Sequence, residues 1–266
     1  MTRKERFRFV IDYFQQHIPD AETELLYDSP YQLLVAVILS AQCTDKRVNM
    51  TTPAIFEKYP DPIALSQASY EDLFDLIKSI SYPGNKTRHL IGMAKMLVDK
   101  FNCKIPLTVE ELMQLPGVGR KTAHVITSVI DQQPNMAVDT HVFRVSARIG
   151  LTVNAKTPLI TEKQLIKYLP TEYVHKAHHW LILHGRYICV ARKPKCHLCG
   201  LKPVCRFYQK VVLLNDRERP EKDYIRCGSY TLISPPPYLL NYDVSRQGQT
   251  ALNTELPINH DASNSD

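Results

Sequence analysis

Residues 115–121 read Leu115-Pro116-Gly117-Val118-Gly119-Arg120-Lys121, directly before a stretch of helical hydrophobic period. The two glycines let the backbone turn tightly with positive φ and leave no side chain in front of the amides. Because the first N–H groups of a helix have no intrahelical partner, they face outward from this turn. An anion fits there, and a DNA phosphate is the leading candidate. A Gly-x-Gly turn alone is weak evidence, since most such turns only reverse the chain.

Helical period dominates the rest of the first two hundred residues. Ser29-Pro30 indicates a helix start, and residues 31–39 are apolar on all sides, as in a helix at the centre of a domain, although their β-branched side chains also permit a strand. Further amphipathic helices are expected at residues 45–59, 69–80, 86–101, 109–115, 120–131, 140–149, 162–169 and 174–189. No alternating strand pattern lies between them, so we predict an all-α fold.

The body of the chain is basic. Residues 1–210 carry 28 Lys and Arg against 19 Asp and Glu, whereas residues 211–266 carry 5 against 8. This charge favours a polyanionic partner such as nucleic acid over an acidic small molecule, although an ordinary basic soluble protein would share it. Residues 211–266 include Pro235-Pro236-Pro237 and an Asn, Ser and Asp-rich end without apolar period, so we expect a flexible tail there.

Cysteine usage and hydropathy indicate the compartment. The seven cysteines are an odd number and four of them gather within residues 189–205, so a disulfide framework is not expected. The longest apolar run, residues 33–39, is far shorter than the ~20 residues that cross a bilayer. The N-terminus does not follow the pattern of a signal peptide. We expect a cytoplasmic monomer that does not associate with membranes.

Four cysteines indicate a metal centre. Cys189, Cys196, Cys199 and Cys205 follow the spacing C-x6-C-x2-C-x5-C, within 17 residues. Soft sulfur ligands suit a zinc ion or an iron–sulfur cluster, and their chemistry alone leaves both open. The loop between the first two ligands, residues 190–195, carries three positive charges, including Lys193 and Lys195. We expect the metal to fix this loop against phosphate.

Lys121 has two interpretations. It lies in the first turn of the helix expected at residues 120–131. With His124 and Ser128 it is placed on the polar face of that helix, at the edge of the face near Val125. Partial screening from water and the positive end of the helix dipole would favour a neutral, nucleophilic amine. Taken alone, an exposed lysine that contacts phosphate is the commoner interpretation.

Asp139 follows 18 residues later and also has two interpretations. Its place directly before Thr140 is typical of an N-cap, which is the default role of an aspartate there. Beside Lys121, a carboxylate held by backbone amides could instead accept a proton and stabilise a cationic sugar.

Four motifs occur together in order along the chain: Leu39-Ser40-Ala41-Gln42-Cys43-Thr44-Asp45, the hairpin with Lys121, Ala137-Val138-Asp139-Thr140-His141 and the cysteine spacing. In this combination the chain resembles the endonuclease III family of DNA repair glycosylases over roughly residues 20–206. The resemblance implies a six-helix barrel domain with a helix-hairpin-helix over residues 22–132. It also implies a second helical domain from residues 1–21 and 133–210 that binds a [4Fe-4S] cluster, with a DNA-binding cleft between the two.

The resemblance also implies an activity. A base-excision repair N-glycosylase of this family would remove oxidised pyrimidines from duplex DNA, and its AP lyase activity would cleave the strand through a Schiff base. Lys121 would form that Schiff base, with Asp139 assisting. Gln42 and Tyr82 match the positions that fill the stack vacated by the flipped-out nucleotide. The turn of Gly117, Val118 and Gly119 would hold the DNA backbone. Duplex DNA with damaged pyrimidines or abasic sites is the expected partner.

Two other classes of protein share part of this pattern. The related adenine-specific glycosylases use a glutamate on the helix that here spans residues 31–40, and this stretch contains no carboxylate. A non-catalytic DNA-binding or redox-sensing cluster protein would share the charge and the cysteines, but it would not need Lys121 together with Asp139.

Overall fold

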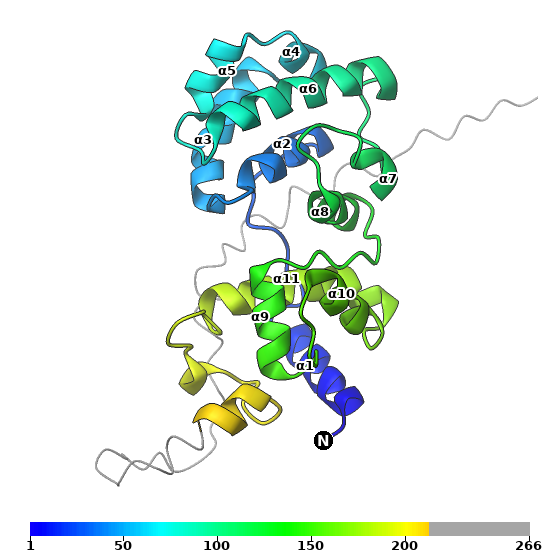
Figure 1. Cartoon of the computed structure of the whole chain (residues 1–266), viewed down its shortest axis with the longest axis vertical. Coiled ribbons are helices and arrows are strands. Elements are labelled where there is room, and N and C mark those ends of the chain that lie inside the picture. The colour runs from blue at the N-terminus through cyan, green and yellow to red at the C-terminus, as the bar shows by residue number, and fades with distance from the viewer. Residues whose placement is uncertain (213–266) are drawn as a thin grey trace, which may run out of the picture.

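The computed structural model describes residues 1–212 of the 266-residue chain. Its helices are α1 (Arg3–His17), α2 (Pro30–Ser40), α3 (Asp45–Lys58), α4 (Pro62–Ser66), α5 (Tyr70–Ile77), α6 (Pro83–Phe101), α7 (Val109–Leu112), α8 (Arg120–Ile130), α9 (Thr140–Ile149), α10 (Pro158–Ile166) and α11 (Thr171–Tyr187), followed by a 3₁₀ turn (Cys196–Leu198) and a π turn (Tyr208–Val212). No strand occurs in residues 1–212, which confirms the all-α prediction (Figure 1). Nearly all of the predicted tail, residues 213–266, lies outside the described residues.

Local sequence explains where most helices begin. Ser29 accepts a hydrogen bond from the Gln32 N–H at 3.2 Å and Pro30 occupies the first turn, so α2 starts as the sequence predicts. Thr44 caps α3 in the same way through the Arg47 N–H at 3.3 Å. The interior of α2 is almost wholly inaccessible to solvent, which confirms the predicted central helix.

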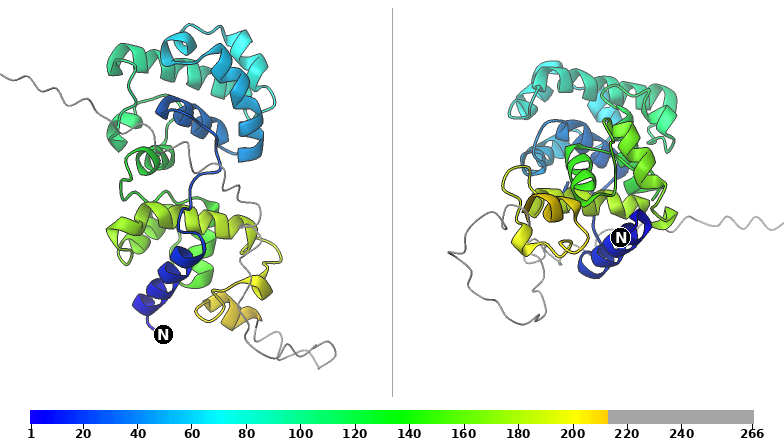
Figure 2. Two further views of the ribbon diagram at one scale, coloured as in Figure 1. Left: turned by 180° about the vertical axis from the view of Figure 1, so that it is seen from behind. Right: turned by 60° about the horizontal axis from the view of Figure 1, so that its bottom comes forward.

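Two hydrophobic cores divide the described chain. One is built from buried residues between Leu25 and Ile126, a segment that runs from before α2 into α8. The other is built from α1, from α9 to α11 and from the segment that follows α11. Figures 1 and 2 show these as two halves, joined by the chain between α1 and α2 and by the chain between α8 and α9. We propose that they correspond to the two domains divided near residues 22 and 132. None of the helices in residues 1–212 combines the length and apolar character that crossing a bilayer requires.

Several helices differ from the prediction. The short helix α4 was not predicted, and Asp61 caps it by accepting from the Ala64 N–H at 2.8 Å. Helix α6 begins at Pro83, three residues earlier than predicted, because proline fits the first turn of a helix. Helix α10 likewise begins at Pro158, four residues earlier than predicted, with Thr157 as its cap.

Candidate active site and metal centre

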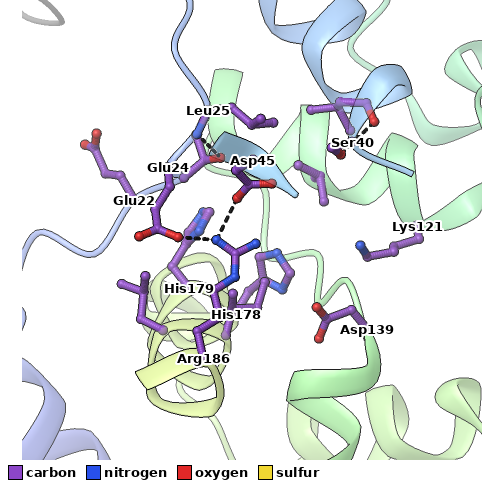
Figure 3. A pocket seen from close by; sticks show the side chains of 15 residues that line it. Glu22, Glu24, Leu25, Ser40, Asp45, Lys121, Asp139, His178, His179 and Arg186 are labelled. Carbon is purple, nitrogen blue, oxygen red and sulfur yellow. Dashed lines mark hydrogen bonds and ion pairs between the residues drawn. The ribbon is translucent and has the colours of Figure 1, made fainter. Parts of the chain in front are cut away.

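A pocket lies between the two cores. Its lining comes from the chain before α2, from the end of α2, and from α3, α8, α9 and α11, and it includes Ser40, Lys121, Asp139, His178 and Arg186. Figure 3 shows the amine of Lys121 and the carboxylate of Asp139 pointing toward the same space, with His178 beside it. The structure therefore brings together two residues that the sequence separates by 18 positions. Gln42 and Tyr82 do not line this pocket.

Lys121 is exposed, and the predicted screening by its apolar neighbours is wrong. Its position in the first turn of α8 is as expected. The assignment of His124 and Ser128 to a polar face is also wrong, because their exposed fractions are 4% and 3%. Ser128 donates to the Asn135 carbonyl at 2.8 Å, so the chain leaving α8 folds back over that face of the helix. A helical wheel cannot anticipate this covering segment.

Asp139 is the N-cap of α9. Its Oδ1 accepts a hydrogen bond from the Val142 N–H at 2.7 Å, which fixes the carboxylate at the pocket edge. The cap and the proposed chemistry are compatible, because the second carboxylate oxygen has no capping contact in the described structure. The residue is half-buried, so its charge lies partly in the low-dielectric interior.

Two histidines form the floor of the pocket. His178 and His179 on α11 are 2% and 8% exposed. Burial, and after it the nearby Lys121 ammonium, lowers the pKa of His178 to about 3, so this imidazole is neutral. Its Nδ1 atom has no hydrogen-bond partner within residues 1–212. The sequence analysis did not predict that either histidine lies beside Lys121.

An ion network that the sequence did not predict closes the other side of the pocket. The Arg186 guanidinium on α11 donates to Asp45 at 2.6 Å and also to Glu24, and Tyr187 donates to the same glutamate. Asn49 fixes the Glu24 segment by donating to the Glu24 carbonyl at 2.8 Å. The network therefore joins α11 to α3 and to the chain before α2 (Figure 3).

The hairpin between α7 and α8 has the geometry that its glycines require. Gly117 adopts φ +84°, and a Cβ there would lie 2.9 Å from the Cβ of His89. Val118 is buried and anchors the turn. Gly119 is the N-cap of α8, no side chain among residues 1–212 caps this helix, and the space in front of Gly119 is open. Anion binding by the first amides of α8 stays a prediction, and the open space at Gly119 is compatible with it.

Gln42 and Tyr82 share an unusual backbone conformation. Their φ angles are +54° and +56°, in the left-handed region that residues other than glycine seldom adopt. Both are exposed, Tyr82 by 63% of its surface. Gln42 follows Ala41, the C-cap of α2, and Tyr82 is the N-cap of α6.

The four predicted ligands line one cavity behind α11, together with Ile149, His184 and Tyr208. No three Cys, His, Asp or Glu side chains in residues 1–212 are close enough to share one metal ion. Four thiols around one cavity supply the soft ligands that zinc and iron–sulfur clusters both take. Burial raises the pKa of the Cys199 thiol to about 12, a cost that a bound metal group offsets by stabilising the thiolate.

The basic loop is fixed at several points. Arg148 on α9 donates to the carbonyls of Val190 and Ala191 at 2.7 and 2.8 Å, and the Lys195 N–H donates to the Ile188 carbonyl at 2.9 Å. Lys193 and Lys195 are exposed on this loop, as expected. Because Asp139 begins the helix that carries Arg148, α9 connects the pocket to the cysteine segment.

Helices α7 and α8 and the glycine turn between them form a helix-hairpin-helix element. The family model of the HhH-GPD superfamily base excision DNA repair proteins matches residues 35–171. Endonuclease III of Rickettsia conorii is 45% identical over 75% of this chain and 94% of its own length. Endonuclease III of Escherichia coli is 38% identical over 79% of this chain and 99% of its own length.

Solved structures agree with these relatives. A trapped endonuclease III–DNA covalent intermediate superposes with a TM-score of 0.75 and 42% identity, over 82% of this chain and all of the other. A non-covalent endonuclease III–DNA complex gives a TM-score of 0.76 and 43% identity, over 80% of this chain and all of the other. The chain belongs to the endonuclease III family, and as a member it is a base excision repair DNA glycosylase.

Proposed function

We propose that this chain removes damaged pyrimidines from duplex DNA and cleaves the strand at the abasic site, with Lys121 as the nucleophile and Asp139 as its partner. The observation that carries the assignment is the convergence of these two side chains in one pocket between the cores. Support also comes from the printed description of a similar structure, a trapped endonuclease III–DNA covalent intermediate.

The reaction follows from placing the Lys121 amine and the Asp139 carboxylate beside the deoxyribose of one nucleotide. The neutral amine of Lys121 attacks C1′ of the flipped-out nucleotide, and the bond from C1′ to the base breaks as the base leaves with its electron pair. Asp139 accepts the proton that the nitrogen loses and balances positive charge on the sugar. Ring opening gives the Schiff base. Loss of a C2′ proton then breaks the bond from C3′ to the phosphate oxygen.

DNA binding is assigned to three surfaces. Gly117, Val118 and Gly119 place backbone amides against phosphate, and Lys193 and Lys195 add charge without reading the sequence. Gln42 and Tyr82 fill the gap that the flipped-out nucleotide leaves in the base stack. Their contacts there offset the free-energy cost of extruding the nucleotide, about a few kcal/mol. The expected lesion is an oxidised pyrimidine, and the cytoplasmic location and the monomeric state stay predictions.

We further propose that Cys189, Cys196, Cys199 and Cys205 hold a [4Fe-4S] cluster. Support comes from the shared cavity and from the surrounding donors: Arg148 lies 3.6 Å from the Cys189 sulfur, and His184 Nε2 lies 3.6 Å from the Cys199 sulfur. When bound, the cluster supplies cross-links between the end of α11 and the following turns, which keeps loop 190–195 rigid.

Borohydride trapping on DNA with an abasic site tests the proposal. Reduction of the Schiff base is expected to leave a covalent adduct, and mass spectrometry of its peptides is expected to locate the crosslink at Lys121. A crosslink on another side chain, or no adduct at all, would reject the assignment of Lys121.

A further inference from the structure

Lys86 is a buried ammonium in the first turn of α6. Its exposed fraction is 5%, and it forms no ion pair within residues 1–212. Its Nζ instead donates to two backbone carbonyls, of Leu39 at 2.8 Å and of Ala41 at 2.7 Å. These carbonyls belong to the last turn of α2 and the residue after it, more than forty positions away in the sequence.

The Lys86 ammonium interacts with the negative C-terminal end of helix α2. Burial lowers the pKa of Lys86, because a charged amine loses hydration there. The last carbonyls of α2 lack intrahelical donors and carry partial negative charge, which compensates the ammonium. No glycine ends α2, since its C-cap is Ala41, so Lys86 provides the donors that would otherwise be missing.

The position of Lys86 matters because of the two residues that it joins. Its side chain binds the carbonyl of Ala41, and the next residue is Gln42. Its backbone N–H donates at 3.2 Å to the carbonyl of Tyr82. The backbone bond is the first helical bond of α6, so the Lys86 side chain links the end of α2, beside Gln42, to the turn of α6 that begins after Tyr82.

We propose that Lys86 is a positioning residue that fixes the Gln42 and Tyr82 loops relative to each other, so that both side chains enter the DNA stack together. The inference rests on the roles proposed above for these two residues and for Lys121. Loops fixed before binding lose less conformational freedom when the side chains insert, so more binding free energy remains to offset extrusion of the nucleotide.

A comparison of two substrates tests this role. The same abasic site is presented in a duplex, where the nucleotide must be extruded, and in a single strand, where no stack has to be filled. The rate of borohydride-trapped adduct formation is measured for Lys86→Met, which keeps length but loses the charge. We expect a rate about tenfold below wild type on the duplex, and a wild-type rate on the single strand.

Two further variants complete the experiment. Lys100→Met removes the same charge from the exposed last turn of α6 and should leave both rates unchanged. Lys86→Gln retains a donor for one carbonyl and should be intermediate on the duplex, and it carries the test if circular dichroism shows that Lys86→Met is unfolded. A fluorescent 2-aminopurine beside the abasic site should show less unstacking with Lys86→Met than with wild type.

Each outcome is decisive. Equal losses on duplex and single strand would mean that Lys86 only supports the fold, and an unchanged duplex rate would mean that the loops need no such link; either result overturns the inference. Failure of wild-type protein to form an adduct on both substrates would instead reject Lys121 as nucleophile, and this inference with it.

Discussion

Arg186 on α11 and Asp45 at the start of α3 form an ion pair across the pocket, with 2.6 Å between Nη1 and Oδ2. The two residues belong to different halves of the described chain, and Glu24 accepts from the same guanidinium. The side chains of Arg186 and Asp45 are 29% and 15% exposed. A partly desolvated pair of this kind holds the two walls of the pocket at a fixed separation.

Arg186→Met should lower the free energy of unfolding by about 2 kcal/mol, because Glu24 and Asp45 would be left as close, uncompensated carboxylates. The loss is smaller than for a fully buried pair, since water reaches part of the network. Denaturant unfolding measures it. Adding Asp45→Asn removes one of the two charges and should restore part of the stability, whereas a single variant as stable as wild type would show that the bridge contributes nothing.

Asp139→Asn and Asp139→Ala separate the two roles of this side chain. Asparagine caps a helix nearly as well as aspartate, so Asp139→Asn should keep wild-type stability and yet slow base release by about 100-fold. Asp139→Ala should show the same slow turnover and lose about 1 kcal/mol of stability as well. Single-turnover kinetics and thermal unfolding give the two measurements. Wild-type turnover by Asp139→Asn would restrict the residue to capping.

A feature of the fold or the site could be predicted from the sequence where it depends on residues that are close to one another along the chain. The Ser29 and Asp139 caps and the Gly117 turn are set by neighbours within a few residues, and the structure has them where the sequence placed them. The burial of His124 was missed, because a helical wheel describes one helix and omits the chain segment that covers its polar side.

The contacts that shape the pocket are long-range. Arg186 and Glu24 are 162 positions apart, and Lys86 and Leu39 are 47 apart. No spacing rule connects such pairs, since their approach depends on how α2, α6 and α11 pack. A signal existed for Lys86 nonetheless: it is a lysine in the first turn of a helix, where cations are unfavourable, which indicates a partner elsewhere.

Lys193→Ala with Lys195→Ala should weaken DNA binding and flatten its salt dependence. Each lost phosphate contact removes about 0.9 from the slope of log affinity against log salt concentration, so the double variant should be shallower by about 1.8. Fluorescence anisotropy at several salt concentrations measures this slope. The matched control is Lys100→Ala with Lys104→Ala, which removes two exposed charges at and after the end of α6. Equal slopes for the two double variants would place the cysteine loop off the DNA.

His178 should make the protein less stable in acid. Its pKa is about 3 in the folded state against an ordinary value of 6.5, so between these values the unfolded chain binds a proton that the folded chain does not. The free energy of unfolding should therefore fall as the pH drops below 6.5, by up to about 1.4 kcal/mol per pH unit from this residue. His178→Gln should reduce that slope, and His89→Gln, at an exposed position, serves as the control. Identical slopes for wild type and His178→Gln would contradict the prediction.

Cys199→Ser should remove the cluster and destabilise the cysteine segment together. Its sulfur is held between α11 and the following turns, so losing one ligand frees several elements at once, and the loop of Lys193 and Lys195 loses its support. We expect bound iron and visible absorbance to fall, the thermal midpoint to drop and DNA binding to weaken. Cys103→Ser changes a cysteine outside the cavity and should match wild type. A colourless Cys199→Ser protein with wild-type stability and DNA affinity would contradict the structural role. If metal analysis of the wild-type protein found zinc without iron or sulfide, the site would be a zinc site and the proposed cluster would be wrong.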